Sequence, residues 1–334
     1  MSKKRFLSGI KPTGFPHIGN YAGMLLPMLQ RAANTEYDVN IFIADYHSLN
    51  DANARKNLGG LSLELAATLL ALGFDPKSCT FYRQSDVPET FELTSFLTNF
   101  TPKGLMNRAH AYKAAKAGGL SALDDEDMGI NMGLYNYPIL MSADILLFDA
   151  DYVPVGRDQR QHIEIARDIA ASVNAFYGEA VLKLPEGIIS ADTMEVPGID
   201  GRKMSKSYGN QLPIFAPPAE VEKIVKRIKT DSKLPAEPKD EDNLLLKFHQ
   251  AMATAEAHAD FRKRFLPGGM GYGDAKKEVM AAHEARFGKA RAEYERLMAD
   301  AGYVNSILAE GAKKARDIAV PVLKRVRKAA GFST

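Results

Sequence analysis

The stretch from Phe6 to Asn20 reads FLSGIKPTGFPHIGN. Its first three residues are apolar enough to predict a short strand. Two glycines and two prolines make residues 9–16 rich in turns, and a helix follows whose apolar face would hold Ala22, Leu25, Leu26, Leu29 and Ala33. A strand that ends in glycines before a helix lets backbone amides and the helix N-terminus approach a phosphate group.

The alternation of strands and helices continues along the chain. Residues 39–44 have the continuous apolar run of a buried parallel strand, 61–72 form an apolar helix closed by Gly73, and 80–83 form another strand. Residues 137–148 predict a helix and 152–155 a strand. Gly156 is expected to begin a helix that carries Asp158, Gln159, His162 and Glu164. This order predicts an α/β fold with a doubly wound, Rossmann-like parallel sheet.

A change in composition near residue 217 predicts two domains. Residues 1–216 would form the Rossmann-like domain, with an insertion around 100–135 whose segment from Ala114 to Asp127 reads as a surface loop. Pro217-Pro218 begins a helix, and nearly everything after it has a helical pattern. We therefore expect residues 217–334 to form an all-helical second domain.

Composition limits the possible functions. The chain has 334 residues, of which 46% are hydrophobic and 25% charged, as in ordinary globular proteins. The 43 basic and 41 acidic residues nearly cancel, so any nucleic-acid surface must be local. The single cysteine, Cys79, excludes an internal disulfide and an iron–sulfur or thiolate–zinc site, and we expect a buried, inert thiol. With no apolar run long enough for a signal or a membrane span, we expect a cytoplasmic protein.

Two constellations carry charge suited to a polyphosphate. Lys203-Met204-Ser205-Lys206-Ser207 follows Asp200-Gly201-Arg202, and a mobile loop with two lysines could close on the β- and γ-phosphates. His17 could donate a hydrogen bond or a positive charge to a phosphoryl oxygen. The ordinary alternatives are a solvated lysine loop and a histidine that only caps the helix at Gly19. Neither G-x-G-x-x-G nor a Walker A sequence is present.

A third constellation surrounds a carboxylate. Asp144 follows a largely apolar run, residues 137–143, and a buried carboxylate needs a partner. That partner could be the N–H of a bound ligand, a helix cap or an internal ion pair. Chemistry alone favours the cap or the ion pair.

The first two constellations resemble the His-Ile-Gly-His and Lys-Met-Ser-Lys-Ser signatures of class I aminoacyl-tRNA synthetases. The first is matched in three of four positions, with Asn20 in place of the last His, and the second completely. The resemblance to the tryptophanyl-tRNA synthetases extends over essentially the whole chain. It includes residues 8–10, 19–21, 84–85, 87–89, 137–144, 153–159, 230–232 and 271–273.

That resemblance implies a two-step reaction. L-Tryptophan and Mg-ATP would give tryptophanyl-adenylate and pyrophosphate, and the adenylate would be transferred to tRNA(Trp) with release of AMP. It also implies a homodimer and an anticodon-reading role for basic faces of the helical domain, around residues 223–227, 313–316 and 324–328. Two alternatives remain open: a tyrosine-specific synthetase, and a synthetase-like paralogue that binds tRNA without catalysis.

The resemblance also assigns residues. Asp144 would accept the indole N–H and Gln159 would hold the ammonium group. The remaining substrate-site residues would be Gly9, His47, Tyr137, Met141, Ile145, Val153 and Val155. His17, Lys203 and Lys206 would be catalytic. The ATP-site residues would be Lys11, Pro12, Thr13, Gly19, Asn20, Gly156, Arg157, Asp158, Met194, Lys203, Met204, Ser205, Lys206 and Ser207, and Mg²⁺ would arrive with ATP, without a resident metal.

Single positions bear on the choice of substrate, and two of them depart from the pattern of the family. Tyrosyl-tRNA synthetases carry Gln at the position of Met141 and Tyr at that of Ala143. An apolar thioether suits an indole face, so Met141 favours tryptophan. Lys11 replaces a Gln that is usual in bacterial members, and Leu7 replaces a Phe often found near the indole.

Overall fold

A computed structural model describes residues 3–110, 112–113, 130–156, 159–189 and 194–333. Five parallel strands form one sheet in the order β3-β2-β1-β4-β5. Their bounds are β1 Lys4–Ile10, β2 Tyr37–Ile43, β3 Thr80–Arg83, β4 Tyr152–Val155 and β5 Glu186–Ile189. The chain moves outward from β1 through β2 to β3 and then crosses to β4 on the other side. This topology confirms the doubly wound α/β fold.

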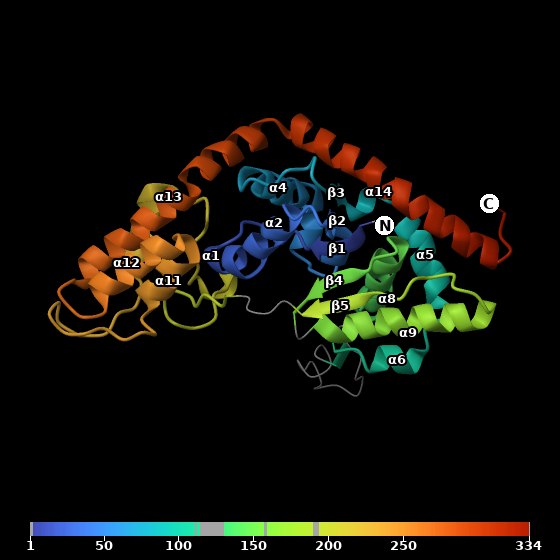
Figure 1. Ribbon diagram of the computed structural model, residues 1–334, viewed down its shortest axis with the longest axis horizontal. Helices are drawn as coiled ribbons and strands as arrows, with labels where there is room; N and C mark the ends of the chain where they lie inside the picture. Colours follow the sequence, from blue (N-terminus) through green and yellow to red (C-terminus); the bar gives the residue numbers. More distant parts are fainter. Residues whose placement is uncertain (1–2, 111, 114–129, 157–158, 190–193, 334) are drawn as a thin grey trace.

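Helices cover both faces of the sheet (Figure 1). In the first part of the chain they are α1 Ile18–Asn20, the π-helical turn Tyr21–Leu25, α2 Leu26–Ala32, α3 Asp45–Ser48, the 3₁₀ turn Ala54–Lys56, α4 Leu58–Ala71, the 3₁₀ turn Gln84–Asp86, α5 Glu89–Thr98, α6 Lys103–Asn107, α8 Met132–Leu147 and α9 Arg160–Tyr177. The later helices are the 3₁₀ turn Lys206–Tyr208, α10 Pro218–Lys226, α11 Leu244–Met252, α12 Ala255–Phe265, α13 Tyr272–Ala299 and α14 Ala301–Ala329.

The side chains of alternate strand residues lie in two separate hydrophobic cores, one on each face of the sheet. Ile41 and Phe81 belong to the core shared with α2, α4 and the later helices. Their neighbours Phe42 and Tyr82 belong to the core shared with α5, α8, α9 and the end of α14. Both faces of the sheet are therefore buried, as the run at residues 39–44 predicts, in which the one polar residue, Asn40, is itself buried.

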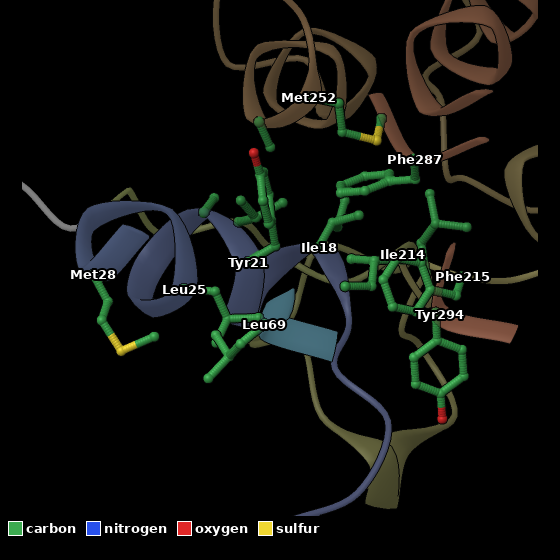
Figure 2. Packing of buried hydrophobic residues seen from close by; sticks show 14 of the residues in the cluster. Ile18, Tyr21, Leu25, Met28, Leu69, Ile214, Phe215, Met252, Phe287 and Tyr294 are labelled. Atoms are coloured by element: carbon green, nitrogen blue, oxygen red, sulfur yellow. The ribbon is translucent and has the colours of Figure 1, made fainter. Parts of the chain in front are cut away.

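The first helix differs from the prediction. Leu25 and Ala22 are buried as expected, but Ala33 is exposed, and Met28 and Ala32 are buried in place of the predicted Leu29 and Ala33. A π-helical turn, Tyr21–Leu25, precedes these positions, so the spacing of one continuous α-helix does not describe this segment. Figure 2 shows Tyr21 and Leu25 packed beside Ile18 and Leu69.

The start of helix α9 and the presence of strand β5 also differ from the prediction. Helix α9 begins at Arg160, four positions later than the predicted start at Gly156. Strand β5 was not predicted at all. Strands β3 and β4 have the predicted bounds. Cys79 is buried, as expected, and burial raises the pKa of its thiol to about 12. The segment from Ala114 to Asp127 lies outside the described residues.

Helix α14 joins the two parts of the molecule. It begins beside α13 and then runs along the sheet to α5 (Figure 1). Arg316 pairs with Glu89 at 2.7 Å, Arg325 pairs with Asp149 at 2.6 Å, and Arg327 pairs with Glu92. These three arginines, which belong to the basic faces at residues 313–316 and 324–328, thus hold α14 to the sheet-containing part. None of the described helices is both long and apolar enough to cross a membrane.

Candidate active site

A cavity of about 560 Å³ opens at the carboxyl ends of β1, β2 and β4. We call it the central cavity. It lies where the chain leaves β1 toward β2 on one side and returns through β4 on the other, which is the usual ligand position in an open α/β sheet. Thirteen predicted site residues line it: Gly9, Lys11, Thr13, Asn20, His47, Tyr137, Met141, Asp144, Ile145, Val153, Val155, Gly156 and Gln159.

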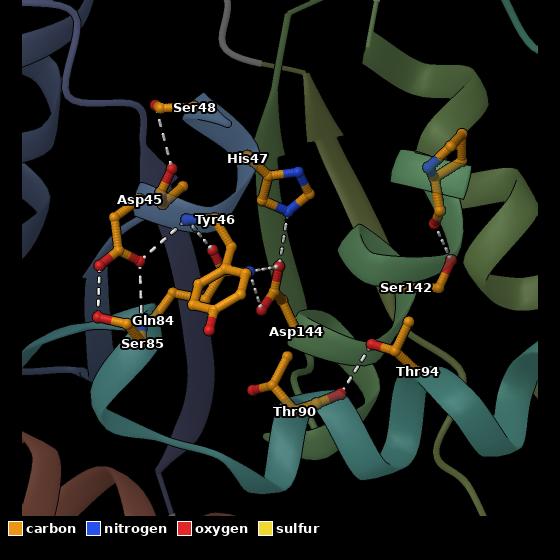
Figure 3. A network of polar contacts seen from close by, with 12 residues as sticks. Asp45, Tyr46, His47, Ser48, Gln84, Ser85, Thr90, Thr94, Ser142 and Asp144 are labelled. Carbon is orange, nitrogen blue, oxygen red and sulfur yellow. Dashed lines mark hydrogen bonds and ion pairs between the residues drawn. The ribbon is translucent and has the colours of Figure 1, made fainter. Parts of the chain in front are cut away.

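The carboxylate of Asp144 is the most deeply buried charge of this cavity, with only 3% of the residue exposed. His47 Nε2 lies 2.9 Å from Asp144 Oδ2, and Gln84 Nε2 donates to both carboxylate oxygens at 2.9 Å (Figure 3). Burial raises the pKa of Asp144, while the hydrogen bond from His47 opposes that rise. The internal partner favoured by chemistry therefore exists. It does not occupy every acceptor position, since a carboxylate has about four lone-pair sites.

Polar groups and rings continue the lining of the cavity beyond His47. The hydroxyl of Tyr137 contacts His162 Nε2, and the Tyr137 ring meets His47 edge-on at 5.8 Å between centroids. Lys11 Nζ lies 5.4 Å from the centroid of the Tyr137 ring, and burial lowers the pKa of this lysine. Lys11, the departure from the usual Gln, thus places its ammonium beside the predicted indole wall.

His17 caps helix α1 and can still donate a hydrogen bond. Asn20 N donates to His17 Nδ1 at 3.2 Å, and His17 N donates to Asn20 Oδ1 at 3.2 Å, so the two residues form a reciprocal capping box. Because Nδ1 accepts, the proton of the neutral ring lies on Nε2. Burial, aided by the charge of Lys206, lowers the pKa of His17 to about 4. Near neutral pH, His17 is a hydrogen-bond donor and not a cation.

The lysine loop lies against the His17 turn. Lys206 Nζ donates to Thr13 O at 2.5 Å. The Met204 sulfur lies 3.5 Å from the position that a Cβ would take on Gly19. Residues 17 and 213 also form an antiparallel bridge. The two signature segments, almost two hundred positions apart, therefore meet at one edge of the central cavity.

Asn210 holds this loop from inside. Its side-chain oxygen accepts from Ser205 N at 2.9 Å, and its amide donates to Asp200 Oδ1 at 2.8 Å and to Lys203 O at 3.1 Å. Asn210 is only 1% exposed, whereas Lys203, Lys206 and Ser207 are exposed. The backbone of the loop is fixed while its cationic side chains remain accessible.

The remaining predicted ATP-site residues lie at the margin of the central cavity or outside the described residues. Met194 O lies 3.5 Å from the position that a Cβ would take on Gly23, a lining residue. Pro12 is buried between Lys11 and Thr13 and does not line the cavity. Arg157 and Asp158 lie outside the described residues.

Two residues of this site were not assigned from the sequence. Gln84 binds the Asp144 carboxylate from sixty positions away, and Asn210 follows the signature loop without belonging to it. For Gln84 the available signal was its position directly after a strand, where parallel sheets place ligand-binding groups. Within the described residues, no three His, Cys, Asp or Glu side chains are grouped as metal ligands would be.

Comparisons with known proteins agree with this geometry. Residues 2–288 match the model of the family described as tRNA synthetases class I (W and Y). The chain is 46% identical to Tryptophan--tRNA ligase of Neisseria meningitidis, with 99% of both chains covered. It is also 46% identical to that of Pseudomonas aeruginosa, with 98% of this chain and 74% of the relative covered. Tryptophanyl-tRNA synthetase from Campylobacter jejuni, solved with ADP and tryptophan, is similar with a TM-score of 0.87 and 40% identity over 98% of this chain and 100% of that chain. The chain therefore belongs to the class I aminoacyl-tRNA synthetases, in the tryptophanyl-tRNA synthetase family.

Proposed function

We propose that the central cavity is where this tryptophan–tRNA ligase joins L-tryptophan to AMP and then to tRNA(Trp). The observation that carries the proposal is a buried carboxylate, Asp144, in an otherwise largely apolar wall. A buried polar group rejects ligands that leave it unpaired much more strongly than an apolar wall rejects a ligand of slightly different size. Asp144 is thus suited to select a ring that carries an N–H.

Tryptophan would lie with its indole between apolar side chains and its N–H on Asp144. The walls would be Met141, Ile145, Val153, Val155 and the ring of Tyr137, with Gly9 leaving space at the end of β1. Gln159 would hold the ammonium end, and His47 would lie beside the Asp144 carboxylate. Leu7, which replaces the usual Phe, lines the same cavity.

ATP would occupy the side of the cavity that faces the two signature segments. Phosphoryl transfer of this kind depends on positioning and charge stabilisation and needs little proton transfer by the protein. His17 Nε2–H would donate to the α-phosphate, while Lys203 and Lys206 would stabilise the departing pyrophosphate. The remaining proposed contacts are Lys11, Pro12, Thr13, Gly19, Asn20, Gly156, Arg157, Asp158, Met194, Met204, Ser205 and Ser207. Mg²⁺ would enter bound to ATP.

The larger organisation is also part of the proposal. Residues 1–216 would form the catalytic domain, and residues 217–334 would form the helical domain that reads the anticodon. The enzyme would act as a cytoplasmic homodimer. Light scattering on the purified full chain measures the oligomeric state directly.

Amino-acid-dependent exchange of pyrophosphate into ATP tests the proposed function. Measured with each of the twenty amino acids, exchange is expected with tryptophan alone. Exchange with tyrosine and not tryptophan would instead identify a tyrosine-specific enzyme. Binding of tRNA without any exchange would identify a non-catalytic paralogue.

Replacing Asp144 by Ala tests the substrate site itself. We expect kcat/KM for tryptophan to fall by about 10²-fold or more, because the indole contact and the bonds to His47 and Gln84 are all removed on the amino-acid side of the cavity. The KM for ATP should change little. The chain contains no tryptophan, so the fluorescence of the bound amino acid reports its binding directly. Equal losses for tryptophan and ATP would show that Asp144 is only structural.

A further inference from the structure

Strand β3 is an edge strand of the described sheet, and helix α14 covers its outer side. The contact is very close at Gly311, where a Cβ would lie 1.6 Å from Phe81 O. No side chain fits between the helix and the strand at this point. Any larger residue at position 311 would force the helix and the strand apart.

A second contact joins α14 to the last residue of β3. Arg83 Nη1 donates to Asn305 Oδ1 at 3.1 Å, and Arg83 Nε donates to Asp86 Oδ2 at 3.0 Å. The guanidinium therefore connects helix α14 with the turn that follows the strand.

The residue after Arg83 is Gln84, which is 1% exposed. Its Nε2 donates to both oxygens of Asp144 at 2.9 Å, and its Oε1 accepts from Tyr46 N at 3.2 Å. Both ends of the Gln84 amide are therefore engaged, and its position follows the end of β3. A shift of β3 would move the donor that orients the Asp144 carboxylate.

We propose that helix α14 positions the indole-selecting carboxylate, acting through strand β3 and the amide of Gln84. Gln84 is a positioning residue that touches Asp144, and Asn305 and Gly311 act on it through β3. This inference rests on the proposed function of Asp144. It explains why a helix that begins beside α13 runs so tightly along the substrate-binding sheet.

The alternative is that pairing with β2 alone fixes β3. Residues 80–83 pair with 40–43 along the whole strand, and that pairing is independent of α14. Under this alternative, changes in α14 would lower stability but leave substrate selection unchanged. Selection is therefore the property to measure.

The test compares tryptophan with its benzothiophene analogue, in which sulfur replaces the indole N–H. The quantity measured is the ratio of their kcat/KM values in pyrophosphate exchange, using the full chain. The wild-type ratio is expected to be large, because the analogue leaves the acceptor position that His47 and Gln84 do not occupy without a donor. The variants are Gln84→Ala, Asn305→Ala and Gly311→Ala, and thermal unfolding is recorded for each.

Two matched controls lie on the same helix. Ser306→Ala changes an exposed neighbour of Asn305 whose hydroxyl bonds within the helix to Tyr303 O. Gly302→Ala places a Cβ where the nearest atom is Asp300 Oδ1 at 3.7 Å. Both controls are expected to keep the wild-type ratio.

We expect Gln84→Ala to reduce the ratio by about ten-fold or more, and Asn305→Ala by about two- to five-fold, because a hydrogen bond to a charged group is lost or displaced. If Gly311→Ala fails to fold, the exposed Asn305 still decides the question. An Asn305→Ala enzyme with the wild-type ratio would overturn the role of α14, and an unchanged ratio in Gln84→Ala would overturn the inference as a whole. If Asp144→Ala itself kept the wild-type ratio, the proposed function would fail instead.

Discussion

At the scale of single residues, the structural contacts of a side chain are compatible with its proposed chemical role. His17 forms the helix cap that its position favours, and the same hydrogen bond from Asn20 leaves the ring proton on Nε2. Asp144 has the internal partners that a buried carboxylate requires, yet it still lines the central cavity. In both cases the structural interpretation of the residue is true, and it is compatible with the proposed role in catalysis for His17 and in substrate binding for Asp144.

Lys206 gives a prediction at this scale. Replacing it by Met should lower the kcat of pyrophosphate exchange by about 10²- to 10³-fold, because a charge near the departing pyrophosphate is lost. Tryptophan binding, followed by the fluorescence of the ligand, should change less than about two-fold, since Lys206 lies on the ATP side. Lys277→Met, which changes an exposed lysine on α13 that pairs with Asp274, is the matched control. A large loss of tryptophan binding would contradict this division of roles.

The sequence identifies the carboxylate but not the amide that orients it. An acidic residue after an apolar run is visible in the sequence, as Asp144 is. The role of Gln84 depends on a contact between positions sixty residues apart, which only the three-dimensional arrangement reveals. Which residues form such a pair depends on how the chain folds and not on the local sequence around either residue.

At the scale of elements, local pattern predicts strands well when they are rich in β-branched and aromatic residues. Residues 39–43 and 80–83 belong to this class. Strand β5 begins with Glu186 and Gly187, which give little strand signal, and it is held by pairing with β4. The π-helical turn Tyr21–Leu25 was also unpredictable, since the apolar spacing there fits an ordinary helix.

Asn210 gives the prediction for the lysine loop. Asn210→Ala removes three hydrogen bonds that hold residues 200–205, so we expect the loop to sample other conformations. The KM for ATP should rise by about ten-fold while the KM for tryptophan stays within about two-fold. The exposed Asn34→Ala serves as the control. An unchanged KM for ATP would show that the loop is ordered without this amide.

At the scale of the whole molecule, buried histidines connect stability with pH. His249 is 3% exposed, and its Nδ1 lies 3.3 Å from Nδ1 of His258. Burial, together with the charge of His258, lowers the pKa of His249 to about 4. The pKa of His17 is also about 4. Both are near 6.5 in an unfolded chain. Between about pH 6.5 and 4 the unfolded chain binds protons that the folded chain does not, so stability falls as the pH decreases.

We therefore expect the melting temperature to be several degrees lower at pH 5 than at pH 7. Each such histidine contributes on the order of 2 kcal/mol to this difference. His249→Gln removes one titrating group, so its melting temperature should depend less on pH over the same range. A parallel shift of both proteins at the two pH values would rule out His249 as a source of the effect.

Because α14 covers strand β3, loss of this helix is expected to affect the solubility of the protein. Backbone amides and carbonyls on an uncovered sheet edge can pair with another chain. Proteolysis or truncation ahead of Ala301 would remove helix α14 and expose the edge of strand β3, whose backbone could then pair with another chain. Fragments of that kind should therefore self-associate more readily than the full chain.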